Sequence, residues 1–243
     1  FQTLSDNSTM VFENLQLQNQ ATFKFNDLFL ALHYNLKKGK LKITPGFSGH
    51  IFYVYDHQFN DLQQETQTKL LPDFFAEYQF KNTRSLTFQY SITNEFSDIK
   101  KYATGLLLNS YQSLSGGSRE IESSLYHNYN LRYSDFNMYN FTHIFGNITY
   151  KKSLNPVKTT TLMVDTQSIS YPVNLANPDE TISGNLNLGK KWKKWEINMG
   201  GMLNYGKNYN LLNDEEVYSK SFMQNYSMSI ETRFKDAPNF EMG

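Results

Sequence analysis

Five histidines are the side chains in this sequence best suited to bind a metal ion or to move a proton at neutral pH. A tight turn at Lys38 and Gly39 would place His33 opposite Thr44, away from His50. None of the five has the short, regular spacing of metal ligands, and each falls on a separate predicted strand or loop. We therefore expect no metal site from the set His33, His50, His57, His127 and His143.

Carboxylates could act in pairs as catalytic acids and bases. A glycosidase needs two of them about 5 to 9.5 Å apart, and nothing in the sequence places Asp73, Glu77 or Glu196 in such a pair. The run 214–216, Asp-Glu-Glu, is a possible calcium ligand, but a solvated acidic loop explains it more simply.

Glycines offer no catalytic motif either. Gly116 and Gly117 do not connect an apolar strand to a helix, so they do not form a phosphate-binding loop. The sequence predicts no catalytic residue and no cofactor, and hence a protein that is not an enzyme.

The elements that would position these side chains are strands. From Pro72 to Ser97, apolar and polar residues alternate on both sides of the polar turn 82–84. If Lys81 pairs with Ser85, the apolar side chains of both strands share one face, with Phe74 opposite Ile92. The same alternation predicts further strands over residues 28–36, 41–55, 125–133, 144–150, 171–190, 195–205 and 226–230, and the start of one more at 239–243.

The predicted connections between strands are alternately short and long. The connections after residues 36, 81, 136, 190 and 234 are short, whereas those near residues 60, 108, 160 and 213 are longer. Short turns at one end and long loops at the other are typical of bacterial outer-membrane barrels. About nine strands and the start of a tenth are predicted, and single-chain bacterial barrels have even strand numbers, so we expect part of a larger antiparallel transmembrane β-barrel.

Composition agrees with this fold class. Of the 243 residues, 39% are hydrophobic and 16% aromatic, which suits a sheet with one wet face and one face with aromatic girdles. The net charge of zero argues against nucleic acid as a partner, and the absence of cysteine excludes disulfides and thiolate sites. The longest apolar run, 28–32, is far shorter than a spanning helix needs, and residue 1 does not begin a signal peptide.

The alternation assigns side chains to two faces of one barrel region, 1–243, in which residues 1–21 form a loop or a frayed strand and no plug domain is visible. The predicted lumen-facing residues are Asp73, Glu77, Gln89, Asn128, Arg132 and Glu196. Aromatic residues near strand ends predict an interface belt, although a sugar-stacking surface is the alternative for them. The predicted belt consists of Tyr53, Tyr55, Tyr133, Tyr150, Trp195 and Tyr205.

Several motifs resemble one known family. The short turns, the loop 115–122 and the stretch 171–175 are similar to the outer-membrane β-barrel family of Bacteroidota, whose members look like the barrel portion of TonB-dependent receptors. The closest match is Pro172-Val173-Asn174 followed by Gly184, the Lys-Trp-Lys-Lys turn at 191–194 and the strand at Trp195. In loop 115–122 the Gly-Asn-Pro run of the family is replaced by Gly-Gly-Ser.

The resemblance implies an importer of a bulky nutrient in the cell outer membrane, with a plug and a TonB-contacting segment outside this sequence. Its expected partners are outer-membrane lipid, TonB, and a surface lipoprotein or other outer-membrane subunits. Two alternatives stay open: a non-transporting barrel scaffold in an outer-membrane complex, and a secreted glycan-binding β-sandwich or solenoid.

Overall fold

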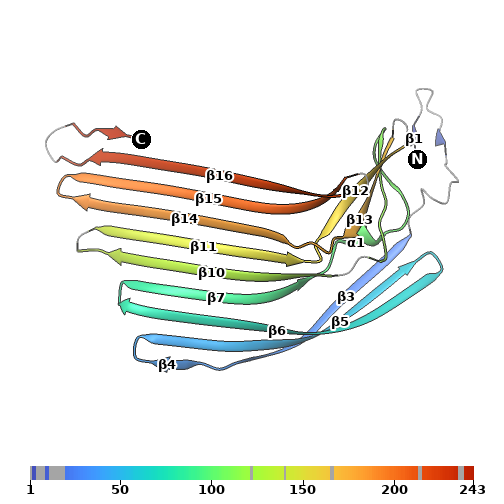
Figure 1. Ribbon diagram of the computed structural model, residues 1–243, viewed down its shortest axis with the longest axis horizontal. Coiled ribbons are helices and arrows are strands. Elements are labelled where there is room, and N and C mark those ends of the chain that lie inside the picture. Colours follow the sequence, from blue (N-terminus) through green and yellow to red (C-terminus); the bar gives the residue numbers. More distant parts are fainter. Residues whose placement is uncertain are drawn as a thin grey trace.

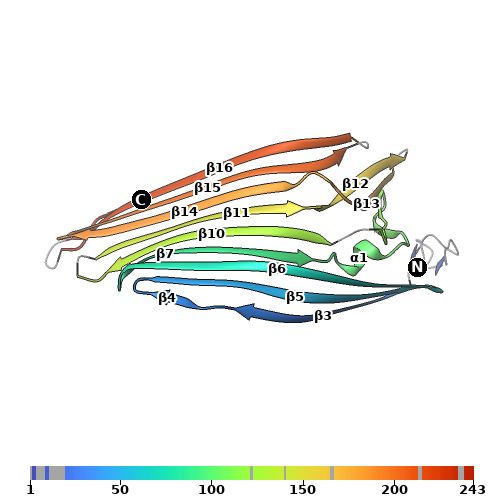
Figure 2. The same ribbon diagram turned by 60° about the horizontal axis from the view of Figure 1, so that its bottom comes forward.

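The computed structural model describes residues 2–3, 9–10, 20–120, 123–139, 141–164, 167–212, 215–234 and 238–243. In these residues the chain forms one large antiparallel sheet whose strands follow one another in sequence order, with smaller elements at one end (Figure 1). Figure 2 shows the same sheet from a second direction, with the covering elements again gathered at that end.

The large sheet is a meander in which neighbours along the chain are neighbours in space. One strand is interrupted at residues 34–35, so β4 continues β3 along the same partner. In the described part of the chain this gives nine long strands and the start of a tenth, as predicted. They are β3 (Ala21–His33) with β4 (Leu36–Lys38), β5 (Leu41–Gln58), β6 (Asp61–Lys81), β7 (Arg84–Glu95), β10 (Ser124–Asn137), β11 (Thr142–Leu154), β14 (Asp179–Trp192), β15 (Trp195–Leu212), β16 (Glu215–Thr232) and β17 (Glu241–Met242).

Shorter elements occupy the two long connections. A four-stranded sheet is built from both, with β9 and β13 running parallel, and a one-turn helix precedes it in the first connection. These elements are α1 (Ile99–Tyr102), β8 (Leu107–Ser110), β9 (Ser113–Ser115), β12 (Val157–Val164) and β13 (Gln167–Asn174). Near the N-terminus β1 (Gln2–Thr3) pairs with β2 (Thr9–Met10). The other residues of the predicted loop or frayed strand 1–21 lie outside the described residues up to residue 19, and Ala21 already begins β3.

The strand registers divide the side chains cleanly between two faces. Phe88 lies opposite Leu131, which lies opposite Ile148, whereas their neighbours Gln89 and Asn130 form a polar row on the other face. The apolar face is uncovered over much of its area; for example, Leu30 is 71% and Phe222 64% exposed. The apolar residues therefore do not form the core of a compact globule.

The turns confirm the predicted asymmetry at one end of the sheet. Residues 39–40, 82–83 and 193–194 are two-residue turns, and 138–141 connects β10 to β11. Gly39 has φ +60°, a conformation that glycine adopts without steric cost. At the opposite end the connections 96–123 and 155–178 are long. No helix in the described part of the chain has the length and hydropathy that crossing a membrane requires.

Two predicted loops at that opposite end are wrong. The longer connection predicted near residue 60, over residues 56–68, is not a loop, because β5 and β6 continue as a paired hairpin up to Gln58 and Asp61, with Phe59 and Asn60 as the turn. Residues 215–217, assigned to an acidic loop, begin β16, while 213–214 lie outside the described residues. In the β5–β6 hairpin, residues 61–68 are polar apart from Leu62, so they lack the alternation that identifies a half-buried strand.

Two predicted registers differ from the structure by two residues. Asn82 and Thr83 form the β6–β7 turn with an irregularity between Gln79 and Lys81, so Phe74 lies opposite Tyr90 and not Ile92. A shift of two residues keeps every side chain on its predicted face, because the side-chain period of a strand is two.

The first turn shows the same shift. It consists of Gly39 and Lys40, which places His33 opposite Gly46 instead of Thr44. The predicted strand 171–190 is also two elements, since the chain leaves β13 at Asn174 and enters β14 at Asp179.

A cysteine pair tests the β6–β7 register, since the sequence has no cysteine of its own. Opposite residues in an antiparallel pair have Cα atoms about 4.5 to 5.5 Å apart, within the range of a disulfide. We expect the Phe74→Cys/Tyr90→Cys protein to form an intramolecular disulfide under mild oxidation, detected by mass spectrometry. The Phe74→Cys/Ile92→Cys protein is the control, and preferential cross-linking of that pair would show that the three-residue turn is correct.

Candidate functional site: the polar face and its covering loop

The six predicted lumen-facing residues all lie on the polar face of the sheet. Asp73 is opposite Ser91, which is opposite Asn128, and the row formed by Glu77, Thr87 and Arg132 runs parallel to it, four residues closer to the short turns. Gln89 occupies the row between these two, and Glu196 reaches the same face farther along, by the alternation of β15. The structure thus brings five of the six residues onto three adjacent strands, with Glu196 near a short turn.

Contacts on this face are mostly between amides, hydroxyls and paired charges. Asp73 Oδ2 is 3.0 Å from His33 Nε2, and Glu196 Oε2 is 3.0 Å from Arg233 Nε. Asn130, which the sequence did not single out, donates to Asn147 Oδ1 and Thr149 Oγ1 at 2.9 Å each. Such a surface is wettable and presents hydrogen-bond donors and acceptors.

The predicted belt residues lie on the opposite, apolar face, but at different levels. Tyr150 and Tyr205 belong to one row across the strands, while Tyr133 and Trp195 lie closer to the short turns. Tyr53 and Tyr55 lie on the part of β5 that leads to the hairpin end. The structure therefore does not unite these six residues in one belt.

Tyr90 and Tyr129 join the row that contains Tyr150. Their ring centroids are 4.7 Å apart, and those of Tyr129 and Tyr150 are 5.6 Å apart. The alternation of apolar and polar residues already placed Tyr90 and Tyr129 on the apolar face. That they lie opposite each other follows only from the strand register in the structure.

Three of the histidines have defined polar partners. His33 pairs with Asp73, His50 Nδ1 is 2.9 Å from Asp27 Oδ1, and His127 Nδ1 is 2.9 Å from the Tyr90 hydroxyl. Across the described ranges, no three histidine, aspartate or glutamate side chains are grouped so as to hold a metal ion.

Connection 96–123 folds back on itself at the end of the sheet opposite the short turns. Asp98 caps α1 by accepting a hydrogen bond from Lys100 N at 3.0 Å. Gly117 N and Ser118 N donate to Ala103 O and Lys101 O at 2.8 and 2.7 Å. A Cβ atom on Gly117 would lie 2.4 Å from Ala103 O, so this close approach requires glycine.

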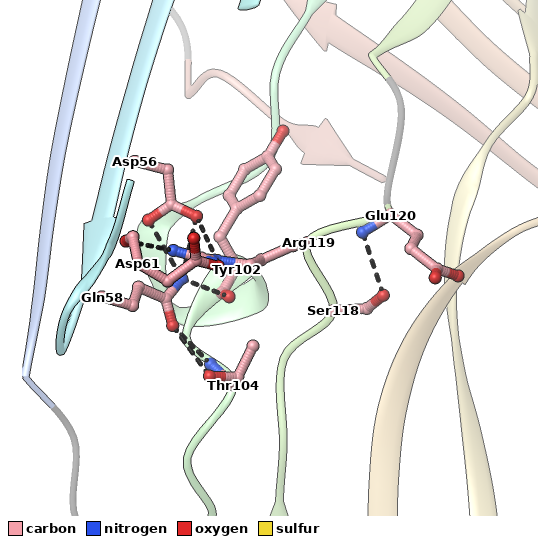
Figure 3. A network of polar contacts seen from close by, with 8 residues as sticks. All are labelled: Asp56, Gln58, Asp61, Tyr102, Thr104, Ser118, Arg119 and Glu120. Carbon is pink, nitrogen blue, oxygen red and sulfur yellow. Dashed lines mark hydrogen bonds and ion pairs between the residues drawn. The ribbon is translucent and has the colours of Figure 1, made fainter. Parts of the chain in front are cut away.

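Arg119 fastens this connection to the β5–β6 hairpin (Figure 3). Its Nε donates to Asp56 Oδ2 at 2.8 Å, while Nη1 and Nη2 bind the Asp61 carboxylate and the Asp61 carbonyl. The Asp56 side chain is 7% exposed and that of Arg119 is 13% exposed. A buried carboxylate requires such a partner, because an unpaired charge away from water is strongly unfavourable.

Gln58 extends the network to the backbone of the connection. Its Nε2 donates to Asp56 Oδ1 and to Tyr102 O, at 3.0 and 2.8 Å. Its Oε1 accepts from both the N–H and the hydroxyl of Thr104, at 2.9 and 3.0 Å. We call Asp56, Gln58, Asp61 and Arg119 the latch.

Aromatic rings pack beside the latch on the same face. Phe23 stacks on Tyr102 with centroids 4.9 Å apart, and Phe96 lies 4.8 Å from Phe25 and 5.2 Å from Phe52. Burial raises the pKa of the Tyr102 hydroxyl above its ordinary value of 10.0. The polar latch and these apolar contacts together hold the connection over the polar face.

The latch has no arrangement for covalent chemistry. It has no nucleophile beside a base, and its two carboxylates are engaged by one guanidinium. Its chemical role is to position a loop. Sequence reasoning missed it because Asp56, Gln58 and Asp61 fall in the stretch assigned to a loop, about sixty residues before Arg119.

Breaking the latch should release the connection locally. We expect Arg119→Gln to leave Asp56 without its charged partner, at a cost of about 3 kcal/mol. Amide exchange at Gly117 and Ser118 should then accelerate about a hundredfold, as measured by hydrogen exchange and mass spectrometry. Lys100→Gln, an exposed charge change on α1, is the control, and equal protection in both variants would contradict the role of the latch.

Tyr102 should make the packing of the connection sensitive to alkaline pH. Its raised pKa means that the folded state disfavours the phenolate, so this contribution to stability is present below pH 10.0 and is lost as the pH rises through the raised pKa. Tyr102→Phe should remove one late-titrating phenol from the ultraviolet titration and weaken the alkaline opening of the connection. Loss of a phenol that titrates near pH 10.0, with the late part of the titration unchanged, would show that Tyr102 ionises as in water.

Comparison with known proteins finds similarity at the level of structure only. No protein-family profile matches the sequence, and no curated protein matches it significantly. The FrpB iron transporter from Neisseria meningitidis (F3-3 variant) superposes with a TM-score of 0.60 at 12% identity, over 92% of this chain and 32% of that one.

Two further solved structures give the same result. The hemophore receptor HasR of Serratia marcescens, a double mutant in complex with HasA and heme, has a TM-score of 0.63 at 11% identity over 88% of this chain and 42% of that one. The copper transporter OprC has a TM-score of 0.55 at 12% identity over 89% and 40%. The chain thus spans less than half of each of these proteins, none of which is described as an enzyme, and it has the fold of part of an outer-membrane β-barrel wall.

Proposed function

We propose that this chain is part of the wall of an outer-membrane transporter that takes up a bulky solute, as the resemblance to TonB-dependent receptors implies. The observation that carries the proposal is the two-faced sheet: one face is apolar and uncovered, and the other is polar and closed over at one end by a latched connection. A membrane barrel needs this arrangement, because lipid contacts one side of the wall and water the other.

The polar face supports a solute pathway. Asn128, Asn130, Asn147 and Arg132 lie on neighbouring strands and supply hydrogen-bond donors and acceptors without a catalytic pair. The similar structures are an iron transporter, a receptor in complex with a hemophore and heme, and a copper transporter, which makes iron chelates, heme and copper the first solutes to test. TonB would act through a segment outside this chain.

The secreted β-sandwich is disfavoured by a specific observation. A sandwich buries its apolar face against a second sheet, yet Leu28 and Leu30 are 63% and 71% exposed on this one. A non-transporting scaffold shares the barrel wall and differs from the importer only in uptake.

Labelling of adjacent cysteines tests the membrane placement in the intact protein in cells. Leu186 and Asn185 are neighbours on β14 that point to opposite faces. We expect a fluorophore on Leu186→Cys to be quenched by lipid-attached spin labels, and a water-soluble maleimide to modify Asn185→Cys. The reverse pattern, or release of the protein into a detergent-free soluble fraction, would refute the barrel.

Uptake separates the importer from the scaffold. Cells carrying the protein should accumulate a labelled iron chelate, heme or copper(II) faster than cells lacking it, and a protonophore should abolish the difference. Equal accumulation of all three with and without the protein, while the labelling pattern holds, would favour the non-transporting scaffold.

A further inference from the structure

A row of charged side chains crosses the apolar face near its loop end. Strand pairing sets His127 opposite Lys152, Lys152 opposite Glu180, Glu180 opposite Lys207, and Lys207 opposite Lys220. Directly paired residues share a face, so the five side chains form a continuous line over β10, β11, β14, β15 and β16. Three lysines and one glutamate give this line, here called the basic row, an excess of positive charge.

Four aromatic side chains and one isoleucine form the next row on the same face, toward the short turns, here called the aromatic row. Tyr129, Tyr150, Ile182, Tyr205 and Phe222 lie opposite one another on the same five strands, each two residues from its counterpart in the basic row. Amphipathic rings in such a row are typical of the boundary between hydrocarbon and head groups. The basic row therefore lies on the head-group side of that boundary.

A hollow of about 460 Å³ lies beyond the aromatic row, on the hydrocarbon side. It forms because Gly146, Gly184 and Gly201 carry no side chain, and Leu131, Leu186 and Leu203 are among the residues that line it. Leu203 is four residues from Lys207 along β15, which corresponds to about 13 Å. The hollow is thus beneath the basic row on the same strands.

The lysines are held in place by neighbouring rings and one carboxylate. Lys207 Nζ is 5.0 Å from the ring centre of Tyr209 and 5.9 Å from that of Tyr218, and Lys220 Nζ is 5.6 Å from that of Tyr218. Lys152 Nζ is 3.7 Å from Glu180 Oε1. Glu216, nearer the hairpin end on this face, accepts a hydrogen bond from Asn177.

We propose that this surface binds one phosphorylated lipid. Its phosphates would lie against Lys152, Lys207 and Lys220, and an acyl chain would fill the hollow at Gly146, Gly184 and Gly201. Charge complementarity selects an anionic head group, and the apolar lining of the hollow selects hydrocarbon. The proposal rests on the outer-membrane placement proposed above.

The head-group part is tested by binding of bis-phosphorylated lipid A to the intact protein purified in detergent, with native mass spectrometry or thermophoresis as the readout. We expect K152Q/K207Q/K220Q to weaken binding about a hundredfold, and dephosphorylated lipid A to bind the unaltered protein comparably weakly. The control K24Q/K37Q/K38Q removes the same charge away from the row, and an equal loss in the control would overturn the site. Competition by millimolar inorganic phosphate would show that free phosphate, and not a lipid, is the ligand.

The acyl-chain part is tested by filling the hollow. A Cβ atom on Gly184 would meet its nearest neighbours at 3.9 and 4.0 Å, so a larger side chain can project from this strand without a clash at its base. We expect G184L to lower affinity for acylated lipid A and to leave affinity for the deacylated, phosphorylated disaccharide unchanged. Unchanged affinity for both probes would remove the hollow from the site.

These outcomes are independent of uptake. Retained lipid binding with no uptake of any tested solute would overturn the importer and keep the lipid site. If K152Q/K207Q/K220Q bound lipid A as tightly as the unaltered protein while the cysteine labelling pattern held, the lipid site alone would be overturned.

Discussion

The backbone hydrogen-bond ladder is the constraint on which the rest of this structure depends. From β5 to β15 each long strand of the meander is paired on both sides over most of its length, except β6, whose residues 61–72 pair with β5 alone, so most N–H and C=O groups find partners within the sheet. A chain surrounded by hydrocarbon has no water to satisfy these groups, and pairing of this kind is the condition for a strand to exist there. Because the backbone is satisfied, the side chains can be apolar on one face and polar on the other.

Pairing also fixes the long-range geometry of the side chains. Residues hundreds of atoms apart along the chain, such as Tyr90 and Tyr205, enter one row because each intervening strand is in register. The same ladder ends where the strands leave the sheet, and there the chain needs side-chain contacts to stay ordered. The latch supplies them: Arg119 and Gln58 replace strand pairing as the means of holding connection 96–123 against β5.

The sequence alone predicted the number of long strands and the face of the sheet on which almost every discussed side chain lies. Both follow from the alternation of apolar and polar residues with a period of two. The sequence did not determine the strand registers: Phe74 and His33 each pair with a residue two positions away from the expected one. Turn length and a local irregularity decide the register, and a two-residue error leaves the alternation unchanged. The end of the β5–β6 hairpin was missed because a strand that is polar on both faces resembles a loop, and the Asp56–Arg119 pair was missed with it.

Different forces therefore govern the two faces at the loop end. On the polar face, burial of Asp56 at 7% exposure makes the pairing with Arg119 obligatory, and this pair holds the connection against β5. On the apolar face, Lys220 is exposed, whereas Lys152 and Lys207 are half-buried, and Glu180 neutralises only one of the three charges. In the proposed importer, a solute entering from this end would pass the latched connection, whereas the proposed lipid would reach the lysines from the side. Strand alternation keeps these two kinds of contact on opposite surfaces of one sheet.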